Sequence, residues 1–253
     1  AVMAHNDWLS FVGASEKYRL PKDIDAQMQA TVSRKYRQAS VEIQLEKTAD
    51  FLLTSLQLPA SFQKTPPKMG PSHSAKGLIP GRQGYQQHLW HATLARDCHI
   101  FVNHPGASFD MSSSRPGFWY GNGVLPHTVQ KGAMVMQIFD IPNWHPIPFT
   151  HAHWPTEIFD QQIVDGQWAF GKKGNGCVAL WCSAPLTVCS EVLTDRELRA
   201  NGQKVAWLAI CGGGDWDHFV ASCHAQQPSF DVSSLTLCLD GQSILSYAEV
   251  AVS

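Results

Sequence analysis

The chain has 253 residues, of which 44% are hydrophobic and 16% are charged, and its formal net charge is −2. This composition supplies a sizeable core for one large β domain or two smaller ones. The charge is nearly balanced and no long basic run occurs, which disfavours nucleic-acid binding driven by phosphate neutralisation. No apolar stretch of the sequence approaches the roughly 20 residues that a membrane span needs.

The first residues and the cysteines bear on the cellular compartment. The stretch "AVMAHNDW" lacks the basic start and the apolar run of a signal peptide, so the localisation stays unknown. There are seven cysteines, and Cys182, Cys211 and Cys238 fall inside apolar, strand-like patterns. We therefore expect free, buried thiols, and no Cys-x-x-Cys pair of the metal-binding kind is present.

Residues 1–57 are predicted to form an N-terminal segment with a short helix and the first strands. Between residues 22 and 37, apolar side chains recur every fourth position at Ile24, Met28, Val32 and Tyr36, behind Asp23 as a cap, which predicts a helix. The stretches "VEIQLEK" and "ADFLLTSLQL" are typical of strands. Residues 58–84 are crowded with Pro, Gly, Ser and Lys and are predicted to be a loop or linker.

Residues 85–253 are predicted to form an antiparallel β-sandwich domain. Short runs rich in β-branched, aromatic and Leu residues follow one another, among them "CHIFVNH", "AMVMQIFDI", "GCVALWCS", "KVAWLAIC" and "HFVASC". We expect a turn or two of helix near "TDRELRANG" and only a tight turn at "CGGGDWD". Asx-Gly pairs, which supply the positive φ angles of type I′ turns, separate several runs: Asn122–Gly123, Asp165–Gly166, Asn175–Gly176, Asn201–Gly202 and Asp240–Gly241. The predicted fold class is all-β, a large β-sandwich or stacked-sheet domain with a minor N-terminal helix.

Two histidine-rich stretches, "HLWHATL" at residues 88–94 and "THAHWP" at residues 150–155, are the first candidates for chemistry. In a regular strand, alternation places His88 and His91 on opposite faces, so the two would not share a site. His151 and His153 share a face, which is a common way to place two imidazoles on one metal ion. The alternative is that these are hydrogen-bonded sheet histidines. The missing metal ligand would come from His88, His91, His104, Asp110 or Asp160.

Between these stretches, "NHPGASFDMSSSRPGFWYGNGVLPH" is typical of a loop-rich insertion. Trp119 and Tyr120 beside Arg115 and Asn122 are the residue types of a saccharide cleft, because aromatic faces stack on sugars while Arg and Asn bind carboxylate or hydroxyl groups. In the alternative interpretation the aromatic rings fold back into the core. The sequence contains no phosphate-binding Gly loop followed by a helical pattern and no Gly-x-Ser-x-Gly elbow.

The stretches "GYQQHLWHATL", "VNHPG", "SRPGFWYGNGVLP", "FTHAHWP" and "WAFGKKGNGCVALWCS" lie within residues 84–183. This region resembles the C-terminal β-sheet region of heparinase II/III-like polysaccharide lyases. The resemblance implies an antiparallel stacked-sheet domain that follows an (α/α) toroid, with the active site between the two. The implied reaction is β-elimination on a uronic-acid polysaccharide, in which a base removes the proton α to the carboxylate and an acid protonates the leaving oxygen.

Carried over to this sequence, the resemblance implies that His88 is the catalytic histidine of the sheet domain. Tyr120 is expected to act as a catalytic acid, although the family generally takes its tyrosine from the toroid. The residues expected to bind substrate are Arg115, Asn122, Trp119 and Trp90. The residues expected to hold a divalent metal, zinc or calcium, are His151 and His153 with Asp110 or Asp160.

This chain has no pattern of a helical toroid, which is its main departure from the family. We therefore expect it to be one piece of a larger enzyme that needs a helical catalytic domain or a sister chain. The expected ligand is an acidic polysaccharide or oligosaccharide, with no nucleic acid and no membrane as partner. Two alternatives stay open: a non-catalytic carbohydrate-binding or structural β module, and a metal-dependent, hydrolase-like β fold built on His151 and His153.

Overall fold

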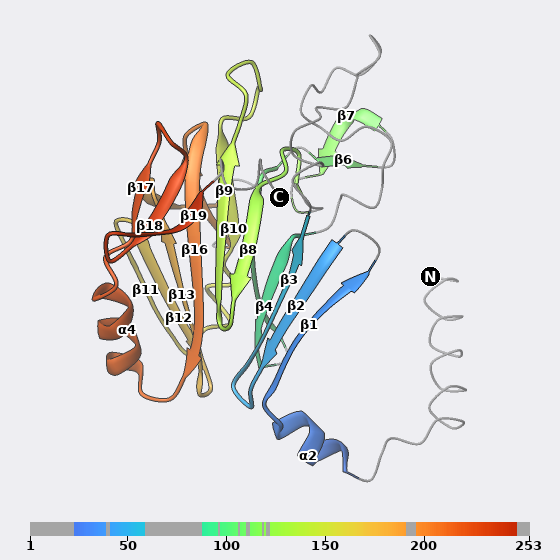
Figure 1. Cartoon of the computed structure of the whole chain (residues 1–253), viewed down its shortest axis with the longest axis vertical. Helices are drawn as coiled ribbons and strands as arrows, with labels where there is room; N and C mark the ends of the chain where they lie inside the picture. Colours follow the sequence, from blue (N-terminus) through green and yellow to red (C-terminus); the bar gives the residue numbers. More distant parts are fainter. Residues whose placement is uncertain are drawn as a thin grey trace.

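The computed structural model describes residues 23–38, 41–58, 88–95, 97–105, 107–109, 112–117, 119, 122–190 and 196–246. These residues form mainly antiparallel strands with two helices, which confirms the predicted all-β class with a minor helix. Figure 1 shows two large sheets side by side, with a helix and a small sheet on the outer side of one of them. None of the described helices is long and apolar enough to cross a membrane.

The first sheet contains eight strands in the order β1-β2-β3-β4-β5-β10-β15-β14, and every neighbouring pair is antiparallel. β3 pairs with β4, so the predicted N-terminal segment, residues 1–57, and the predicted sandwich domain, residues 85–253, contribute strands to one sheet. The strands of this sheet are β1 (Val32–Gln38), β2 (Val41–Lys47), β3 (Phe51–Gln57), β4 (Trp90–Leu94), β5 (Cys98–Asn103), β10 (Phe149–His153), β14 (Leu186–Cys189) and β15 (Glu197–Asn201).

The second sheet contains six strands in the order β11-β12-β13-β16-β9-β8. Its strands are β8 (His127–Lys131), β9 (Met134–Asp140), β11 (Gln161–Asp165), β12 (Trp168–Lys173), β13 (Gly176–Cys182) and β16 (Lys204–Gly213). The remaining elements are α2 (Ile24–Gln29), the pair β6 (Ala107–Phe109) and β7 (Ser112–Gly117), the helix α4 (Trp216–His224), and a three-stranded sheet of β17 (Ser229–Asp231), β18 (Thr236–Leu239) and β19 (Gln242–Ser246).

Two apolar cores lie on the two faces of the second sheet. The larger core joins the sheets, with Leu53 and Ile100 from the first packed in one cluster with Leu180 of the second. The other core packs Ile138 and neighbouring residues against α4 and the three-stranded sheet. β13 is buried along its whole length because it lies between these cores, as its continuous apolar run "GCVALWC" requires.

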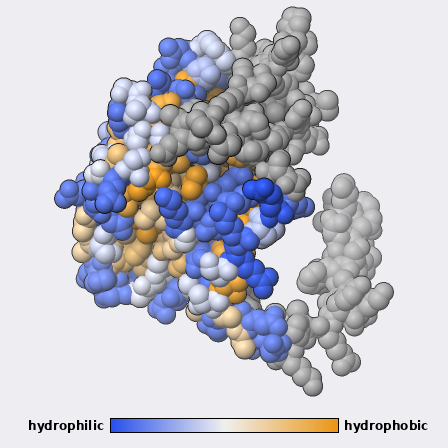
Figure 2. Space-filling view, viewed as in Figure 1, coloured by the Kyte–Doolittle hydropathy of each residue, from blue (hydrophilic) through white to orange (hydrophobic). Residues whose placement is uncertain are grey.

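The least buried large apolar side chains belong mostly to sheet edges. Tyr36 on β1, Val188 on β14 and Ile163 on β11 are each 40–52% exposed, and these three strands are the outermost strands of the two large sheets. An edge strand has a neighbour on one side only, so its side chains are less covered. Figure 2 shows hydrophobic residues among hydrophilic ones on the face in view.

The helix predicted over residues 22–37 is wrong in its second half. α2 ends at Gln29, and residues Val32–Gln38 form β1, which pairs along its whole length with β2. The four-residue spacing of apolar side chains favoured a helix, but an isolated short helix is marginal in water. Pairing with β2 supplies hydrogen-bond partners for the backbone N–H and C=O groups of β1, and this favours the strand over the helix.

Two predictions near the C-terminus are also wrong. The stretch "CGGGDWD" leads directly into α4, which begins at Trp216 and contains all of the predicted strand "HFVASC". Asp215 caps this helix by accepting a hydrogen bond from the backbone N–H of His218 at 2.8 Å, and Phe219 and Cys223, four residues apart, are buried. The helix expected at "TDRELRANG" is instead β15, because this stretch fits between β10 and β14.

Of the Asx-Gly pairs, three lie where neighbouring antiparallel strands connect, as predicted. Asn175–Gly176 lies at the turn from β12 to β13, whose central residues are Gly174 and Asn175. Asp165–Gly166 connects β11 to β12, and Asp240–Gly241 connects β18 to β19 with φ angles of 50° and 76°. Positive φ at both central residues is the mark of a type I′ turn. Asn201–Gly202 instead leads from the first sheet to the second, so an Asx-Gly pair marks a chain reversal here without guaranteeing a hairpin.

Candidate functional site

The histidines of both sequence stretches lie on the outer face of the first sheet, the face turned away from the second sheet. Ala92, Ile100 and Ala152 are fully buried in the core between the sheets. Side chains alternate along a strand, so the residues next to these three point outward. His153 lies opposite Phe101 across β10 and β5, and the pairing of Ala92 with Ile100 places His91 beside the same phenylalanine.

The Phe101 ring is the centre of this group of side chains. Its centroid lies 3.6 Å from that of His88 and 5.1 Å from that of His153, which is stacked on it with an interplanar angle of 6°. The rings of His91 and Trp119 approach it edge-on, with centroids at 5.8 and 5.9 Å. One aromatic ring therefore contacts four others from three separate parts of the sequence.

The Trp119 ring is enclosed by two histidines of β10. It lies parallel to His151, with ring centroids 4.1 Å apart and planes 3° apart, and perpendicular to His153 at 5.4 Å. Flat and edge-to-face contacts of this kind fix the orientation of an aromatic ring. We call the following residues the imidazole–aromatic cluster: His88, His91, Phe101, Trp119, His151 and His153.

Hydrogen bonds fix the proton position on both β10 histidines. His153 Nδ1 lies 2.7 Å from the backbone carbonyl oxygen of His99, and a carbonyl only accepts, so this nitrogen donates. His151 Nδ1 lies 3.1 Å from Oε1 of Glu197, a fully buried residue that Arg199 also contacts. In the neutral form, each ring thus carries its hydrogen on Nδ1 and a lone pair on Nε2.

The histidines of β4 and the segment before it are held neutral. Burial, followed by the charges of His91, His151 and His153, lowers the pKa of His88 to about 4. Burial, together with His99 and His153, lowers the pKa of His91 to about 4 as well. Among the described residues, neither His88 Nδ1 nor His91 Nε2 has a hydrogen-bond partner. These are two partly buried, neutral imidazoles, each with one buried ring nitrogen that lacks a partner among the described residues.

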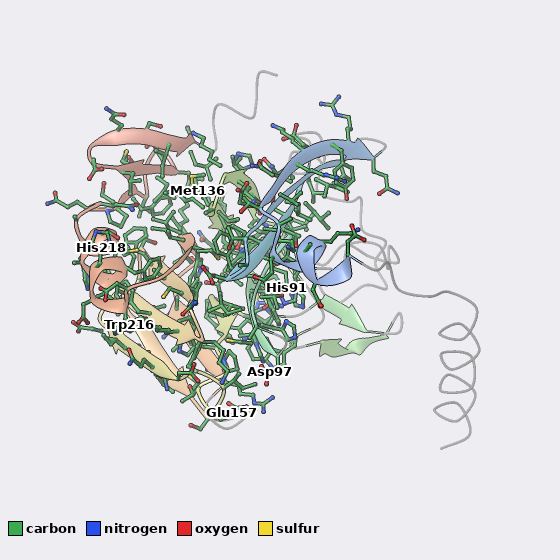
Figure 3. The ribbon with its side chains drawn as sticks, turned by 90° about the horizontal axis from the view of Figure 1, so that it is seen from below. His91, Asp97, Met136, Glu157, Trp216 and His218 are labelled. Carbon is green, nitrogen blue, oxygen red and sulfur yellow. The ribbon has the colours of Figure 1, made fainter. Side chains whose placement is uncertain are left out.

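The expectation that His88 and His91 face opposite sides is wrong. β4 begins only at Trp90, so His88 precedes the regular alternation and its ring turns to the same side as His91. Figure 3 labels His91, which lies far from Trp216 and His218 of α4, on the other side of the molecule. The cluster and the helix are therefore on opposite outer faces of the layered fold.

Trp90 does not belong to this surface. Its side chain is 2% exposed and lies in the core between the sheets, where its indole Nε1 donates to Oε1 of Gln137 at 2.8 Å. Alternation places Trp90 on the inner face because the outer position is taken by its neighbour His91. Its expected role in binding substrate is therefore replaced by a role in joining the two sheets.

The other predicted site residues are placed only in part. Asn122 is buried and its Oδ1 accepts a hydrogen bond from the backbone N–H of His104 at 3.0 Å, so it holds the end of β5. Arg115 lies on β7, and its side chain falls outside the described residues, as do Tyr120 and Asp110. The predicted roles of these three stay predictions.

A metal site at His151 and His153 also stays a prediction. Their Nδ1 atoms donate to a carboxylate and to a backbone carbonyl, which is the usual support for histidines that bind metal through Nε2. Within the described ranges, no group of three or more His, Cys, Asp or Glu side chains is arranged to hold a metal ion. Of the two suggested carboxylates, Asp160 is engaged elsewhere, in an ion pair with Lys173 at 2.9 Å.

Sequence reasoning missed Phe101, Glu197 and Arg199. Phe101 could have been identified from the alternation of "CHIFVNH", because this pattern puts it on the same face as His99. Glu197 and Arg199 fell in a stretch predicted to be helical, so their place beside β10 could not be seen. Comparison with known proteins adds no relative, since no family model, curated protein or solved structure matches the chain.

Proposed function

We propose that this protein is the β-sheet part of a polysaccharide lyase that cleaves a uronic-acid-containing polysaccharide by β-elimination. The imidazole–aromatic cluster is its substrate-facing surface and His88 is the base. One observation carries the proposal: the His88 ring is neutral, its Nδ1 lacks a hydrogen-bond partner among the described residues, and it lies in one cluster with Trp119. This nitrogen is itself buried, so in the proposal the ring turns toward the bound sugar before it accepts the proton.

The reaction needs a base that is unprotonated before the substrate binds. The base removes the proton α to the uronate carboxylate, and the electron pair of that C–H bond forms a C=C bond as the C–O bond to the leaving sugar breaks. A pKa of about 4 keeps His88 in the accepting form at neutral pH but makes it a weak base. A uronate carboxylate beside the ring favours the imidazolium and raises this pKa, so the substrate itself strengthens the base.

The aromatic members of the cluster supply the sugar-binding surface. Trp119 and Phe101 meet edge to face, and the Trp119 ring is only partly buried. Aromatic faces bind the C–H surfaces of sugars, and their rigid placement lowers the entropy lost on binding. In the proposal Tyr120 protonates the leaving oxygen, while Arg115 binds the uronate carboxylate in the bidentate manner of a guanidinium.

The resemblance to heparinase II/III-like lyases rests on the quoted sequence stretches alone. In that family the cleft has a second, helical side, so the proposal includes a helical domain or a sister chain opposite the cluster. The sheet part would then supply the base and one wall of the cleft. This division predicts saccharide binding by the sheet part and full activity only when both sides are present.

The proposal is tested with the full-length gene product and a set of acidic oligosaccharides. Elimination creates a conjugated, unsaturated uronate that absorbs ultraviolet light, whereas hydrolysis and simple binding do not. We expect this product from the wild type and a loss of at least about 100-fold in rate for His88→Ala, since general bases contribute this much. His218→Ala, an exposed histidine on the opposite side of the molecule, is the matched control and should be fully active.

A non-catalytic carbohydrate-binding module is the second candidate, favoured by the enclosed arrangement of Phe101 and Trp119 around His153. This module would bind the same oligosaccharides without forming the ultraviolet-absorbing product. Binding that is unchanged in His88→Ala, together with no product from the wild type, would reject the lyase and support the module.

A further inference from the structure

Glu197 is a buried carboxylate with both oxygens occupied. Its Oε1 accepts from His151 Nδ1 at 3.1 Å and from Arg199 Nε at 3.1 Å, while its Oε2 accepts from Arg199 Nη2 at 3.2 Å. Burial alone would raise the pKa of Glu197, but the hydrogen bonds from His151 and Arg199 hold it below its usual value. The carboxylate is therefore ionised and can only accept hydrogen bonds.

The direction of the Glu197 side chain is not set by strand register. Across β10 and β15, Glu197 lies opposite His153, and His151 lies opposite Arg199. Glu197 nevertheless contacts the diagonal neighbour His151, since His153 Nδ1 is already engaged by the carbonyl of His99. Glu197 therefore bonds to His151 and Arg199, and not to His153, which lies directly opposite it.

This pair lies directly beneath Trp119. His151 is fully buried, and its ring plane is 3° from that of the tryptophan, with centroids 4.1 Å apart. A hydrogen bond to one ring nitrogen selects the orientation of a histidine ring within the space that packing leaves, and only one orientation is parallel to the indole. The ring that Glu197 contacts is therefore the one on which Trp119 is stacked.

We propose that Glu197 is a positioning residue for sugar binding: by accepting the Nδ1 proton of His151, it holds that ring flat against Trp119 and so presents the indole to the saccharide. The inference rests on the proposed function in one respect, namely that Trp119 meets the sugar. Arg199 supports Glu197 by clamping the carboxylate and neutralising its charge, and it is itself held over the Phe149 ring at 4.2 Å.

A purely structural role for Glu197 predicts something different. If the carboxylate only neutralised Arg199, its loss would lower the free energy of unfolding but leave the proton on His151 Nδ1 and the ligand affinity unchanged. The two roles therefore differ in the ring nitrogens of His151, which report the tautomer in ¹⁵N NMR spectra. The protons of His151 also report the ring current of the indole stacked on it.

The experiment compares Glu197→Gln, Glu197→Ala and a control, Glu42→Gln, which removes the carboxylate of an ion pair with Lys35 between β1 and β2. Glu197→Gln keeps a carbonyl that can accept from Nδ1, so we expect the wild-type tautomer and near-normal affinity for an oligouronate. In Glu197→Ala we expect a mixture of tautomers, a reduced indole ring-current shift and about tenfold weaker binding. The control should match the wild type in all three measurements.

If Glu197→Ala does not fold, His151→Phe provides a second variant, because it keeps a flat ring beneath Trp119 and removes only the tether. We expect about the same loss of affinity from it. An unchanged tautomer in Glu197→Ala, or unchanged affinity in His151→Phe, would overturn the proposal. Failure of the wild type to bind any acidic oligosaccharide would instead reject the proposed function, while the tautomer and ring-current measurements would still decide whether Glu197 positions the two rings.

Discussion

The indole Nε1 of Trp90 donates a hydrogen bond to Oε1 of Gln137 at 2.8 Å, across the interface between the two large sheets. Gln137 is fully buried and its Nε2 donates in turn to Oγ1 of Thr128 at 3.0 Å. A second cross-sheet bond runs from Trp207 Nε1 to Thr150 Oγ1 at 2.8 Å. The sandwich is thus joined by directional bonds inside an otherwise apolar core.

Replacing Trp90 by Phe should destabilise the fold without weakening saccharide binding. The change leaves the Gln137 carbonyl buried without its donor, which costs about 1–3 kcal/mol in addition to the loss of packing. Urea denaturation gives the free energy of unfolding, and Trp144→Phe, at a 52% exposed position, is the control that should be neutral. A large loss of ligand affinity in folded Trp90→Phe would contradict this prediction and show that Trp90 contributes to saccharide binding.

The protein should lose stability as the pH falls below about 6.5. Burial lowers the pKa of His104 to about 3 and that of His127 to about 4, from 6.5 in the unfolded chain. Between these values the unfolded chain binds protons that the folded chain does not, so acid favours unfolding. Each such group removes about 1.4 kcal/mol per pH unit over this range. Above pH 6.5 its contribution is fully retained.

Denaturation by urea at several pH values between 4 and 7.5 measures this slope. His127→Gln removes one of the groups and should make the slope shallower by about one proton. His218→Gln, at an exposed position, should leave it unchanged. A free energy of unfolding that stays constant from pH 7 to pH 5 would contradict the assignment of these histidines as buried and neutral.

The metal assignment predicts one divalent ion per chain, held by Nε2 of His151 and His153 with Asp110; of zinc and calcium, this donor set suits zinc. Metal analysis of the purified protein should find this ion, and His153→Ala should lose it because a single remaining imidazole is a weak site. His99→Ala, on the neighbouring strand, is the control. A protein that contains no metal, and whose melting temperature changes neither with a chelator nor with added zinc, would reject the assignment.

Thiol labelling should distinguish two classes of cysteine. All seven are thiols; Cys189 and Cys238 are partly exposed, and the others are buried. Burial raises the pKa of Cys98 and of Cys223 to about 12, which suppresses the reactive thiolate. Mass spectrometry after brief alkylation should find label on Cys189 and Cys238 first, and on the rest only in urea. Rapid labelling of Cys182 or Cys211 in the folded protein would show that the core between the two sheets is accessible to the reagent.

The local residue pattern was sufficient where alternation within one strand determines the face that each side chain takes. The two-residue period of "THAHWP" placed His151 and His153 on one side of β10, and the structure has them there. The continuous apolar run of β13 likewise required cover on both faces, which the two cores provide. Such features follow from the geometry of a single strand and need no knowledge of its neighbours.

The local residue pattern failed where pairing with a strand distant in sequence determined the secondary structure. Val32–Gln38 had helical spacing but became β1 because β2 could pair with it, and the helical stretch expected around Glu197 became β15 because it fits beside β10. The alternation rule does not apply to His88, because β4 begins two residues after it, at Trp90. Backbone pairing over long separations in sequence can override local preference, and a single sequence does not reveal it.

The sequence by itself determined that this protein is built from antiparallel strands, with histidines and aromatics concentrated in a few short stretches. Only the tertiary structure decided which of these meet. β5 and β10 are separated by more than forty residues, yet their pairing puts Phe101 beside His153, and the Trp119 ring stacks on that of His151. The physical reason is that strand period fixes which face a side chain takes, whereas strand order, set by the packing of the whole core, fixes its neighbours.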